Sequence, residues 1–550
     1  RQTQAWIGWW RRNGGEIRPR NLTRASSTDA LHEGAPERLK SPKKCLQKPR
    51  RPQTSTMATS PAGHRDPHRE LGWTSLRYAA GMIHAAIISC ATLSVQPVQL
   101  DGGFEEWDTP AAAPSITGAG SASHIYLLMS LNGPPVNLQG LNNPMTLRLD
   151  WDNNPETGKM AGSLPGVDLE VLFSPSRGKG GSGVAVRRSS DRGAQSWDEV
   201  GFVFAPTVAS NRFELCFPRT LRGLDLVAGS TMPWELSWTD PKPARGIARV
   251  GADRPMAKPT MSAPLPSPAD GATRVVTWNL EKGNLLKQRR VVTRVLAAIK
   301  PHIVLIQEIE DGQTGEDFIN VLRAAVPGSN WTIDLSPRSG TIKSGIATRL
   351  PAKSVRAFDT IKRRGESHGH VRAAALGIDI PGVGPVLAVS AHLKCCGVVD
   401  GPEDMKRIGE VLAIRRAAES AETERDFQGL IIGGDLNLVG GSLPLDLLIA
   451  QGEGLIAELD TPEDLLIIDA WQPDGRGLQT WQEDGQAYTP GRLDYIVISG
   501  SSLRPDPRTT VVLDTLDLPE PALRDMKLQQ SDTKQASDHL PVIVDLMPAS

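Results

Sequence analysis

The sequence predicts an α/β domain over residues 273–548 and an all-β domain over residues 97–250. In the α/β segment, short apolar runs alternate with stretches of helical spacing, as in sheets covered by helices. The other segment is poor in helical spacing and rich in short strand-like runs, which is typical of a β-sandwich. Five prolines between Pro255 and Pro268 separate the two, so residues 251–272 are predicted to form a stiff linker. The strand-like runs of the all-β domain are His124–Leu131, Met145–Leu149, Asp168–Phe173 and Phe202–Phe204.

Two helices can be placed in the α/β domain. Apolar residues at helical spacing begin at Leu286 and end at Ile299, and Pro301 ends this helix before the strand-like run 303–306. The same spacing recurs after the next strands, and predicts a second helix, at Met405, Ile408, Val411 and Leu412.

Polar side chains stand at the ends of the predicted strands of the α/β domain. A strand end holds such groups rigidly while leaving them open to solvent. Each residue alone has an ordinary explanation, because strand-terminal Asp and Asn residues cap loops and single histidines are satisfied polar groups. Their accumulation in one domain instead favours a reactive site. The residues are Asn279, Glu308, His392, Asp435, Asn437, Asp494, Asp538 and His539.

Six motifs around these residues resemble those of a known family: Trp278-Asn279, Gln307-Glu308, Ala391-His392-Leu393, Gly434-Asp435-Leu436-Asn437, Arg492-Leu493-Asp494-Tyr495 and Ser537-Asp538-His539. With them, residues 273–548 resemble the endonuclease/exonuclease/phosphatase superfamily, the family of pancreatic deoxyribonuclease and the abasic-site endonucleases. The resemblance implies an α/β four-layer sandwich, in which two packed mixed sheets are flanked by helices. It also implies a metal-dependent hydrolase of phosphate esters.

The resemblance assigns Asn279 and Glu308 to a Mg²⁺ site, with Asp538 in the same cluster and Mn²⁺ as an alternative ion. A hard divalent cation prefers such oxygen ligands, and it stabilises the negative charge that develops on phosphate oxygens during hydrolysis.

The resemblance places Asp435 and His539 beside the attacking water, with Asp494 orienting His539 as a carboxylate orients a base in catalytic triads. His392 would face the phosphate or the leaving group, and Asn437 would donate hydrogen bonds to a phosphoryl oxygen. The sequence leaves open whether Asp435 or His539 is the base.

Two further residues of this domain have two interpretations each. Arg372 precedes the predicted strand 374–380 and either touches a substrate phosphate or is a solvated loop arginine. Trp481 either borders the pocket or, as we expect, belongs to the core.

The all-β domain carries a resemblance of its own. Its segments Leu100–Asp108 and Asp150–Gly158, the latter followed by Gly166-Val167-Asp168, resemble carbohydrate-binding and related sandwich modules of secreted enzymes. A glycan or a surface is therefore a candidate partner. The alternating oxygen side chains suit Ca²⁺, and an Asx-rich turn without metal is the alternative. The candidate ligands are Asp150, Asp152 and Asn154.

Residues 1–96 hold 16 Lys and Arg against 6 Asp and Glu, and we expect a disordered basic leader that contains a signal peptide. Met57 is an alternative start. The predicted destination is secretion or the periplasm, and Cys90 lies in a loose lipoprotein box. No other stretch is long enough to span a membrane. Because the whole chain has a net charge of −1, residues 97–550 carry about −11, which gives no general attraction to polyanions.

Among the five cysteines, Cys395 and Cys396 are adjacent and follow His392 closely. They form either a vicinal disulfide, in an oxidising compartment, or two free thiols, since such small disulfide rings are strained. Typical nucleases of the family lack this pair, so nuclease specificity does not transfer directly.

The sequence thus predicts a secreted, Mg²⁺-dependent phosphodiesterase, endonuclease-like on DNA or RNA, and we expect a monomer. The first alternative is a phosphatase or phosphodiesterase that acts on a small-molecule or lipid phosphate ester. The second is a catalytically inactive protein that binds a glycan or a surface. The retained set of polar strand-end residues argues against the second alternative.

Overall fold

The computed structural model describes residues 96–549, apart from 108–111, 178–179, 222–223, 239–241, 338, 365–368 and 450–464. Residues 94–550 belong to one compact unit. The predicted signal peptide, Met57 and Cys90 lie outside the described residues. Within them, no helix has both the length and the apolar character needed to cross a membrane.

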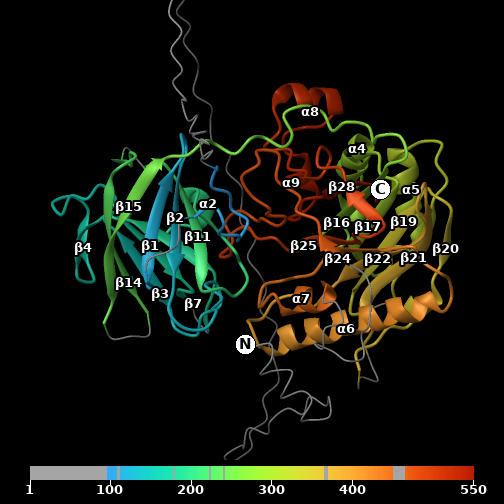
Figure 1. The fold of residues 1–550 in the computed structure, drawn as a ribbon, viewed down its shortest axis with the longest axis horizontal. Helices are drawn as coiled ribbons and strands as arrows, with labels where there is room; N and C mark the ends of the chain where they lie inside the picture. The colour runs from blue at the N-terminus through green and yellow to red at the C-terminus, as the bar shows by residue number, and fades with distance from the viewer. Residues whose placement is uncertain are drawn as a thin grey trace, which may run out of the picture. The chain divides into compact units, whose positions relative to one another are not determined.

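The amino-terminal module is built from β-strands, in the described part of the chain, with one short helix, α2 (Trp197–Val200). Its main sheet has the strand order β10-β11-β2-β1-β15-β14-β3-β6-β9 and encloses an aromatic-rich core around Trp151 and Phe217 (Figure 1). The four strand-like runs of the sequence form β2, β3, β6 and β10. The strands are β1 (Ser115–Gly120), β2 (His124–Ser130), β3 (Met145–Leu149), β4 (Lys159–Ala161), β5 (Leu164–Val167), β6 (Leu169–Phe173), β7 (Ser176–Arg177), β8 (Gly180–Gly181), β9 (Val184–Arg188), β10 (Val203–Ala205), β11 (Arg212–Pro218), β12 (Thr220–Leu221), β13 (Leu224–Asp225), β14 (Thr231–Ser237) and β15 (Ala244–Asp253).

The carboxy-terminal module contains two mixed sheets. One has the order β18-β19-β17-β16-β28-β26, with β27 beside β28, and the other has the order β20-β21-β22-β23-β25-β24. The strands are β16 (Thr273–Asn279), β17 (Ile303–Glu310), β18 (Thr332–Leu335), β19 (Ile342–Thr348), β20 (Ala352–Ser354), β21 (Arg372–Ile380), β22 (Gly384–His392), β23 (Leu430–Asp435), β24 (Leu465–Ile467), β25 (Asp494–Ser499), β26 (Leu503–Pro505), β27 (Val511–Val512) and β28 (Val542–Pro548).

The two sheets face one another across a shared apolar core that includes Leu305 and Ile496. A second core joins β16 and β17 to α4 and α5, and a third joins β22 and β23 to α6 and α7. Figure 1 shows α4 and α5 on one side of the strands and α6 and α7 on the other. The helices are α3 (Asn284–Lys287), α4 (Arg289–Ile299), α5 (Gly315–Ala325), η1 (Arg356–Phe358), α6 (Pro402–Glu422), α7 (Leu443–Ile449), α8 (Glu520–Met526) and α9 (Asp532–Ala536).

Both predicted helices are present, α6 as one helix and the other in two pieces. Leu286 lies in the short helix α3, which ends before Gln288, and the later apolar residues lie in α4. Helix α4 ends at Ile299 and Pro301 follows, as the spacing indicated. Helix α6 begins with Pro402, whose fixed φ angle suits the first helical position.

The proline-rich segment is held against the carboxy-terminal module along part of its length. Strand β15 continues to Asp253, which is beyond the predicted boundary. Met261 is 6% exposed and joins the core around α4, and the Oγ1 atom of Thr260 donates to the carbonyl of Gln472 at 2.7 Å. Loops of the two modules also meet, since the amide of Thr489 donates to Oε1 of the buried Gln139 at 2.8 Å.

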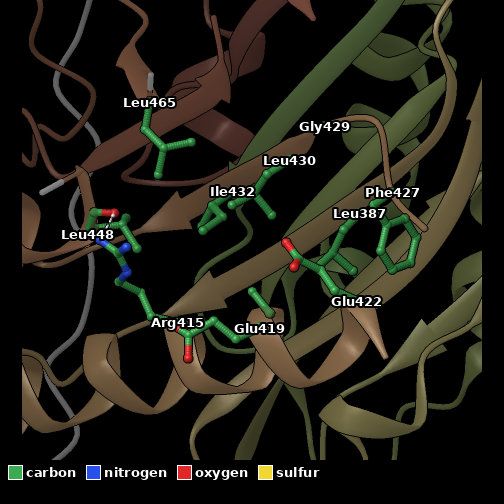
Figure 2. A pocket seen from close by; sticks show the side chains of 11 residues that line it. Leu387, Arg415, Glu419, Glu422, Phe427, Gly429, Leu430, Ile432, Leu448 and Leu465 are labelled. Atoms are coloured by element: carbon green, nitrogen blue, oxygen red, sulfur yellow. Dashed lines mark hydrogen bonds between the residues drawn. The ribbon is translucent and has the colours of Figure 1, made fainter. Parts of the chain in front are cut away.

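A small cavity of about 30 Å³ lies under the carboxy-terminal half of α6 (Figure 2). Arg415 borders it and donates to the carbonyls of Leu447 and Leu448, so it ties α7 to α6. None of the candidate site residues lines this cavity. A cavity this small admits water but no substrate, so it is a packing feature rather than a substrate pocket.

Candidate active site

Four predicted site residues stand at strand ends that the two sheets bring together. Asn279 ends β16, His392 ends β22, Asp435 ends β23 and Asp494 begins β25. In the second sheet, Asp435 is the register partner of both His392 and Asp494. In the first sheet, Asn279 pairs with Gln307, next to Glu308. Strand pairing therefore assembles the site from segments far apart in the sequence.

Glu308 was predicted at a strand end, but it lies at a bulge inside β17, which continues to Glu310. The register between β17 and β19 shifts between Ile306 and Ile309, and Glu308 has a φ angle of +62°. Such a bulge turns a side chain away from its regular direction, and left-handed backbone in a non-glycine residue is strained. The Glu308 carboxylate accepts hydrogen bonds from the amide of Lys282 at 2.8 Å and from Nδ2 of Asn279 at 3.4 Å.

His539 and Asp494 form a buried pair. The distance from Nδ1 of His539 to Oδ2 of Asp494 is 2.7 Å. The same oxygen accepts a hydrogen bond from Oγ1 of Thr480 at 2.7 Å. Burial lowers the pKa of His539, but the charges of Asp494 and Asp435 outweigh it and raise this pKa to about 10. The Nε2 atom of His539 then faces Oδ2 of Asp435 at 3.9 Å.

Asp435 is held by amides on two sides. Its Oδ2 atom accepts from Nδ2 of Asn279 and from Nδ2 of Asn437, each at 2.9 Å, and its Oδ1 atom accepts from the Asn437 amide at 2.9 Å. Burial raises the pKa of Asp435 to about 7, with His539 acting in the opposite direction. A carboxyl group of this kind exchanges its proton near neutral pH.

His392 faces the same carboxylate. Its Nε2 atom lies 3.4 Å from Oδ2 of Asp435 and 3.9 Å from Oε1 of Glu308. Burial, followed by the charge of Arg372, lowers its pKa well below the ordinary value, so this imidazole is neutral at neutral pH. Its Nδ1 atom has no hydrogen-bond partner among the described residues.

Negative charge accumulates at the outer side of the site. Asp538 accepts a hydrogen bond from Nε1 of Trp481 at 2.9 Å. The pKa of Glu281 is raised by burial and then by the neighbouring charges of Asp538 and Glu483, with Glu308 contributing as well. The charge of Lys282 offsets part of this repulsion, and a bound cation would offset more of it. Glu281 was missed in the sequence, although it stands two residues after Asn279.

The donor set suits a hard divalent cation. Glu308 and Asp538 supply carboxylate oxygens, Asn279 supplies an amide oxygen, and the side chain of Glu308 is 17% exposed. A deeper group, Asp435, Asp494 and His539, also has ligand atoms within 4.8 Å of one another. Within this deeper group, His539 and Asp494 hydrogen-bond each other, and Asp435 accepts hydrogen bonds from Asn279 and Asn437.

Ser537 and Trp278 connect the first sheet to the segment that carries His539. The Oγ atom of Ser537 donates to the carbonyl of Asn279 at 2.7 Å and accepts from the amide of His539 at 3.1 Å. The Nε1 atom of Trp278 donates to the carbonyl of His539 at 2.9 Å. The sequence marked these residues only as parts of motifs, and their role is to position Asn279 and His539.

The carboxy-terminal module is similar to a known family. Residues 276–539 match the Endonuclease/Exonuclease/phosphatase family. The module has the phosphoesterase-like fold of that family. A comparison with curated proteins found no match.

Several solved structures are similar to this phosphoesterase-like module. One is humanized D. rerio TDP2 with 14 mutations, which is 14% identical with a TM-score of 0.31. The match covers 50% of this chain and 99% of that chain. ANGEL2, a 2',3'-cyclic phosphatase, is 14% identical with a TM-score of 0.36, and the match covers 50% of this chain and 95% of that one. An endonuclease/exonuclease/phosphatase family protein from Bacteroides thetaiotaomicron is 17% identical with a TM-score of 0.33. The match covers 51% of this chain and 98% of that chain.

Arg372 and Trp481 of the phosphoesterase-like module have defined partners. Arg372 is the first residue of β21, and its Nε and Nη2 atoms donate to the carbonyls of His392 and Leu393 at 3.1 and 2.8 Å. These bonds hold the end of β22, and the predicted phosphate contact stays a prediction. Trp481 is half-buried and donates to Asp538, so it borders the site, and its assignment to the core is wrong.

The candidate calcium residues of the all-β module lie on one turn. Carboxylate oxygens of Asp150, Asp152 and Asp168 lie within 4.8 Å of one another. The backbone amide of Asn154 donates to Oδ1 of Asp150 and to Oδ1 of Asp152, each at 3.0 Å, so Asn154 holds the two carboxylates in place. Burial, followed by repulsion from Asp168 and Asp152, raises the pKa of Asp150 to about 6. The third carboxylate therefore comes from Asp168, which the sequence did not place in the set.

Proposed function

We propose that this protein is a divalent-metal-dependent phosphodiesterase, with DNA or RNA as substrate and Mg²⁺ as its ion. One observation carries the proposal. A buried imidazole, oriented by Asp494 at 2.7 Å, faces Asp435 at 3.9 Å, next to a set of carboxylates whose mutual repulsion Lys282 offsets only in part. The four-layer arrangement proposed for the phosphoesterase-like module supports it, because both sheets deliver their strand ends to this place.

Asn279, Glu308 and Asp538 would hold the cation, which would neutralise the negative charge on the phosphate oxygens when bound. Residues of the site accept the proton of the attacking water. Asp435 and His539 titrate as a coupled pair, so the pair, rather than either residue alone, takes the proton from an attacking water. Asp494 fixes the ring of His539 in the orientation that points Nε2 toward Asp435.

Two more residues would contact the reacting phosphate. His392 is neutral and buried, with Nε2 turned toward Asp435 and Glu308, so it can donate one hydrogen bond to a phosphoryl or leaving oxygen. Asn437 has a φ angle of +49° and donates to Asp435 and to the carbonyl of Leu393. Its first role is thus to fix Asp435. Because both of its N–H groups are engaged, the predicted contact with phosphate would have to replace one of these two hydrogen bonds.

The acidic charge of the chain favours a second candidate, which is a smaller phosphate ester. Residues 97–550 carry about −11, and Glu281, Glu483 and Asp538 lie at the outer side of the site. An acidic surface repels a long polyanion such as DNA or RNA more strongly than a small or lipid phosphodiester, which carries fewer charges. The proposed secretion and the proposed glycan- or surface-binding role of the all-β module rest on the sequence.

The test compares hydrolysis of plasmid DNA, bis-p-nitrophenyl phosphate and a lipid phosphodiester by the full chain, with Mg²⁺ and with EDTA. DNA nicking that disappears in EDTA and in His539→Ala supports the nuclease. If only the smaller esters are hydrolysed, and this turnover is also lost in EDTA and in His539→Ala, the second candidate function is supported. Equal turnover by His539→Ala and the parent protein would overturn the site assignment.

A further inference from the structure

The loop that leaves β22 carries two adjacent thiols close to the candidate active site. Cys395 is half-buried and Cys396 is exposed, whereas Cys216 is buried in the all-β module. All three are free thiols in the structure. The mechanism above uses neither Cys395 nor Cys396. We propose that Cys395 and Cys396 form an oxidation site, at which a peroxide converts the two thiols to one disulfide and thereby lowers hydrolytic turnover. The second half of this proposal rests on the proposed function.

Lys394 favours the reactive form of Cys395. Its Nζ atom lies 3.4 Å from Sγ of Cys395, where an ammonium group stabilises a thiolate. A hydrogen bond from Cys396 is the largest cause that lowers the pKa of Cys395, to about 5, and Lys394 adds to it. The pKa of Cys396 is raised, chiefly by that same hydrogen bond. Cys395 is therefore the nucleophile, and Cys396 is the thiol that retains its proton.

The reaction balances in two steps. The Cys395 thiolate attacks one oxygen of the peroxide, so an S–O bond forms, the O–O bond breaks, and the departing hydroxide takes up a proton to become water. The sulfur of Cys396 then attacks the sulfur of Cys395, so the S–S bond forms, the S–O bond breaks, and the proton of Cys396 leaves with the hydroxyl group as a second water. The thiols lose two electrons, which the peroxide gains.

Arg407 holds the loop at both ends of the dipeptide. Its Nη1 atom donates to the carbonyls of Lys394 and Cys396, each at 2.8 Å. Arg407 is fully buried and pairs with Asp404 at 2.8 Å, so its guanidinium group is held in place. Cys396 has a φ angle of +69°, in the left-handed region. A disulfide between neighbouring residues closes a very small ring, so the backbone that Arg407 holds must rotate to form it.

The same loop is hydrogen-bonded to the candidate site. The carbonyl of Leu393 accepts from Nη2 of Arg372 at 2.8 Å and from Nδ2 of Asn437 at 3.1 Å. Asn437 also donates to Asp435, and Leu393 directly follows His392. A backbone rotation at Cys395 would therefore displace the Leu393 carbonyl, and with it the hydrogen bond to Asn437 and the position of His392.

The site is tested first by mass, independently of activity. The full chain, with Cys45 and Cys90 replaced by serine, is treated with hydrogen peroxide, unfolded, alkylated and digested with trypsin. Both thiols fall in the peptide from Cys395 to Lys406. We expect this peptide to lose the mass of two hydrogens and to resist alkylation until a reductant is added, while Cys216 is alkylated throughout. A Cys395–Lys406 peptide that is still doubly alkylated after peroxide would overturn the oxidation site.

Two variants sharpen this first test. Cys396→Ser removes the second thiol, so Cys395 should gain oxygen in place of losing hydrogen. Lys394→Gln should slow disulfide formation several-fold, because the thiolate loses its ammonium partner. In this variant trypsin no longer cuts before Cys395, so the peptide followed is Ala373–Lys406. An unchanged rate in Lys394→Gln would show that Cys395 is not activated as proposed.

The second test measures turnover of bis-p-nitrophenyl phosphate before and after peroxide. Oxidation should lower turnover, dithiothreitol should restore it, and a Cys395→Ser/Cys396→Ser double variant should keep its turnover in peroxide. A disulfide that forms without changing turnover would overturn the link to the site. If the untreated protein hydrolyses no ester, the proposed function fails, and the mass test still decides whether the oxidation site exists.

Discussion

The Nδ1 atom of His539 lies 2.7 Å from Oδ2 of Asp494, and the oxygen that orients the ring is itself held by Thr480. We expect Asp494→Asn to lower turnover by about 10²- to 10⁴-fold, because the amide neither fixes the ring in the same way nor balances its charge. The pKa of His539, followed by NMR, should fall toward its ordinary value in this variant. Asp469→Asn, at an exposed carboxylate that pairs with Arg492, is the matched control and should retain activity. Full activity in Asp494→Asn would remove Asp494 from the site.

The raised pKa of His539 also predicts a pH dependence of stability. Since the folded-state pKa is about 10 and the ordinary value is 6.5, the stabilisation is fully present below pH 6.5 and is lost as the pH rises through about 10. Asp435 also makes stability fall as the pH rises, because its pKa is raised from 3.8 to about 7 and the folded state therefore holds its proton over that range. In EDTA, the free energy of unfolding should therefore decrease between pH 6.5 and 10 more steeply in the parent protein than in His539→Gln. Urea unfolding across this range measures it, and identical slopes would contradict the charged pair.

Metal binding should be visible as a thermal shift. We expect Mg²⁺ to raise the melting temperature of the parent protein, because a ligand that binds only the folded state stabilises it. Glu308→Gln should lose this rise together with turnover. Glu316→Gln changes an exposed carboxylate on α5 that pairs with Arg323, so it should keep both. An undiminished Mg²⁺ shift in Glu308→Gln would place the cation elsewhere.

Thr480 connects the pair to the backbone. Its Oγ1 atom donates to Asp494 and accepts from the amides of Leu493 and Asp494 at 3.0 and 2.9 Å. Thr480→Val leaves these buried groups without their partner, so it should cost about 1–3 kcal/mol of stability. Turnover should fall as well, because Asp494 loses its anchor. Thr480→Ser keeps the hydroxyl and should remain close to the parent protein in urea unfolding and in turnover.

Calcium binding to the all-β module can be tested separately. If Asp150, Asp152 and Asp168 hold the ion, Ca²⁺ should raise the melting temperature of the parent protein, and Asp152→Ala should abolish the rise. Asp253→Asn, at a half-exposed carboxylate of the same module that pairs with Arg219, is the control. The same melting temperature with Ca²⁺ and with a chelator would leave an Asx-rich turn without metal.

Some features could be predicted from the sequence because they depend on neighbouring residues. The spacing from Val292 to Ile299 predicted α4, and the strand-end positions of Asn279, His392 and Asp435 followed from local runs of apolar residues. Glu281 was missed for a physical reason. Its proximity to Asp538 depends on how a turn after β16 lies against a segment more than two hundred residues away.

The sequence by itself determined which residues of the phosphoesterase-like module end its strands, and which chemical groups they carry there, because alternation, helical spacing and prolines act over short distances. Only the tertiary structure decided that Thr480 anchors Asp494, that Trp481 contacts Asp538, that Asp168 joins Asp150 and Asp152, and that Arg407 holds the Cys395–Cys396 loop. Each of these contacts joins segments whose approach is set by the packing of sheets, helices and loops, and no local pattern encodes that packing.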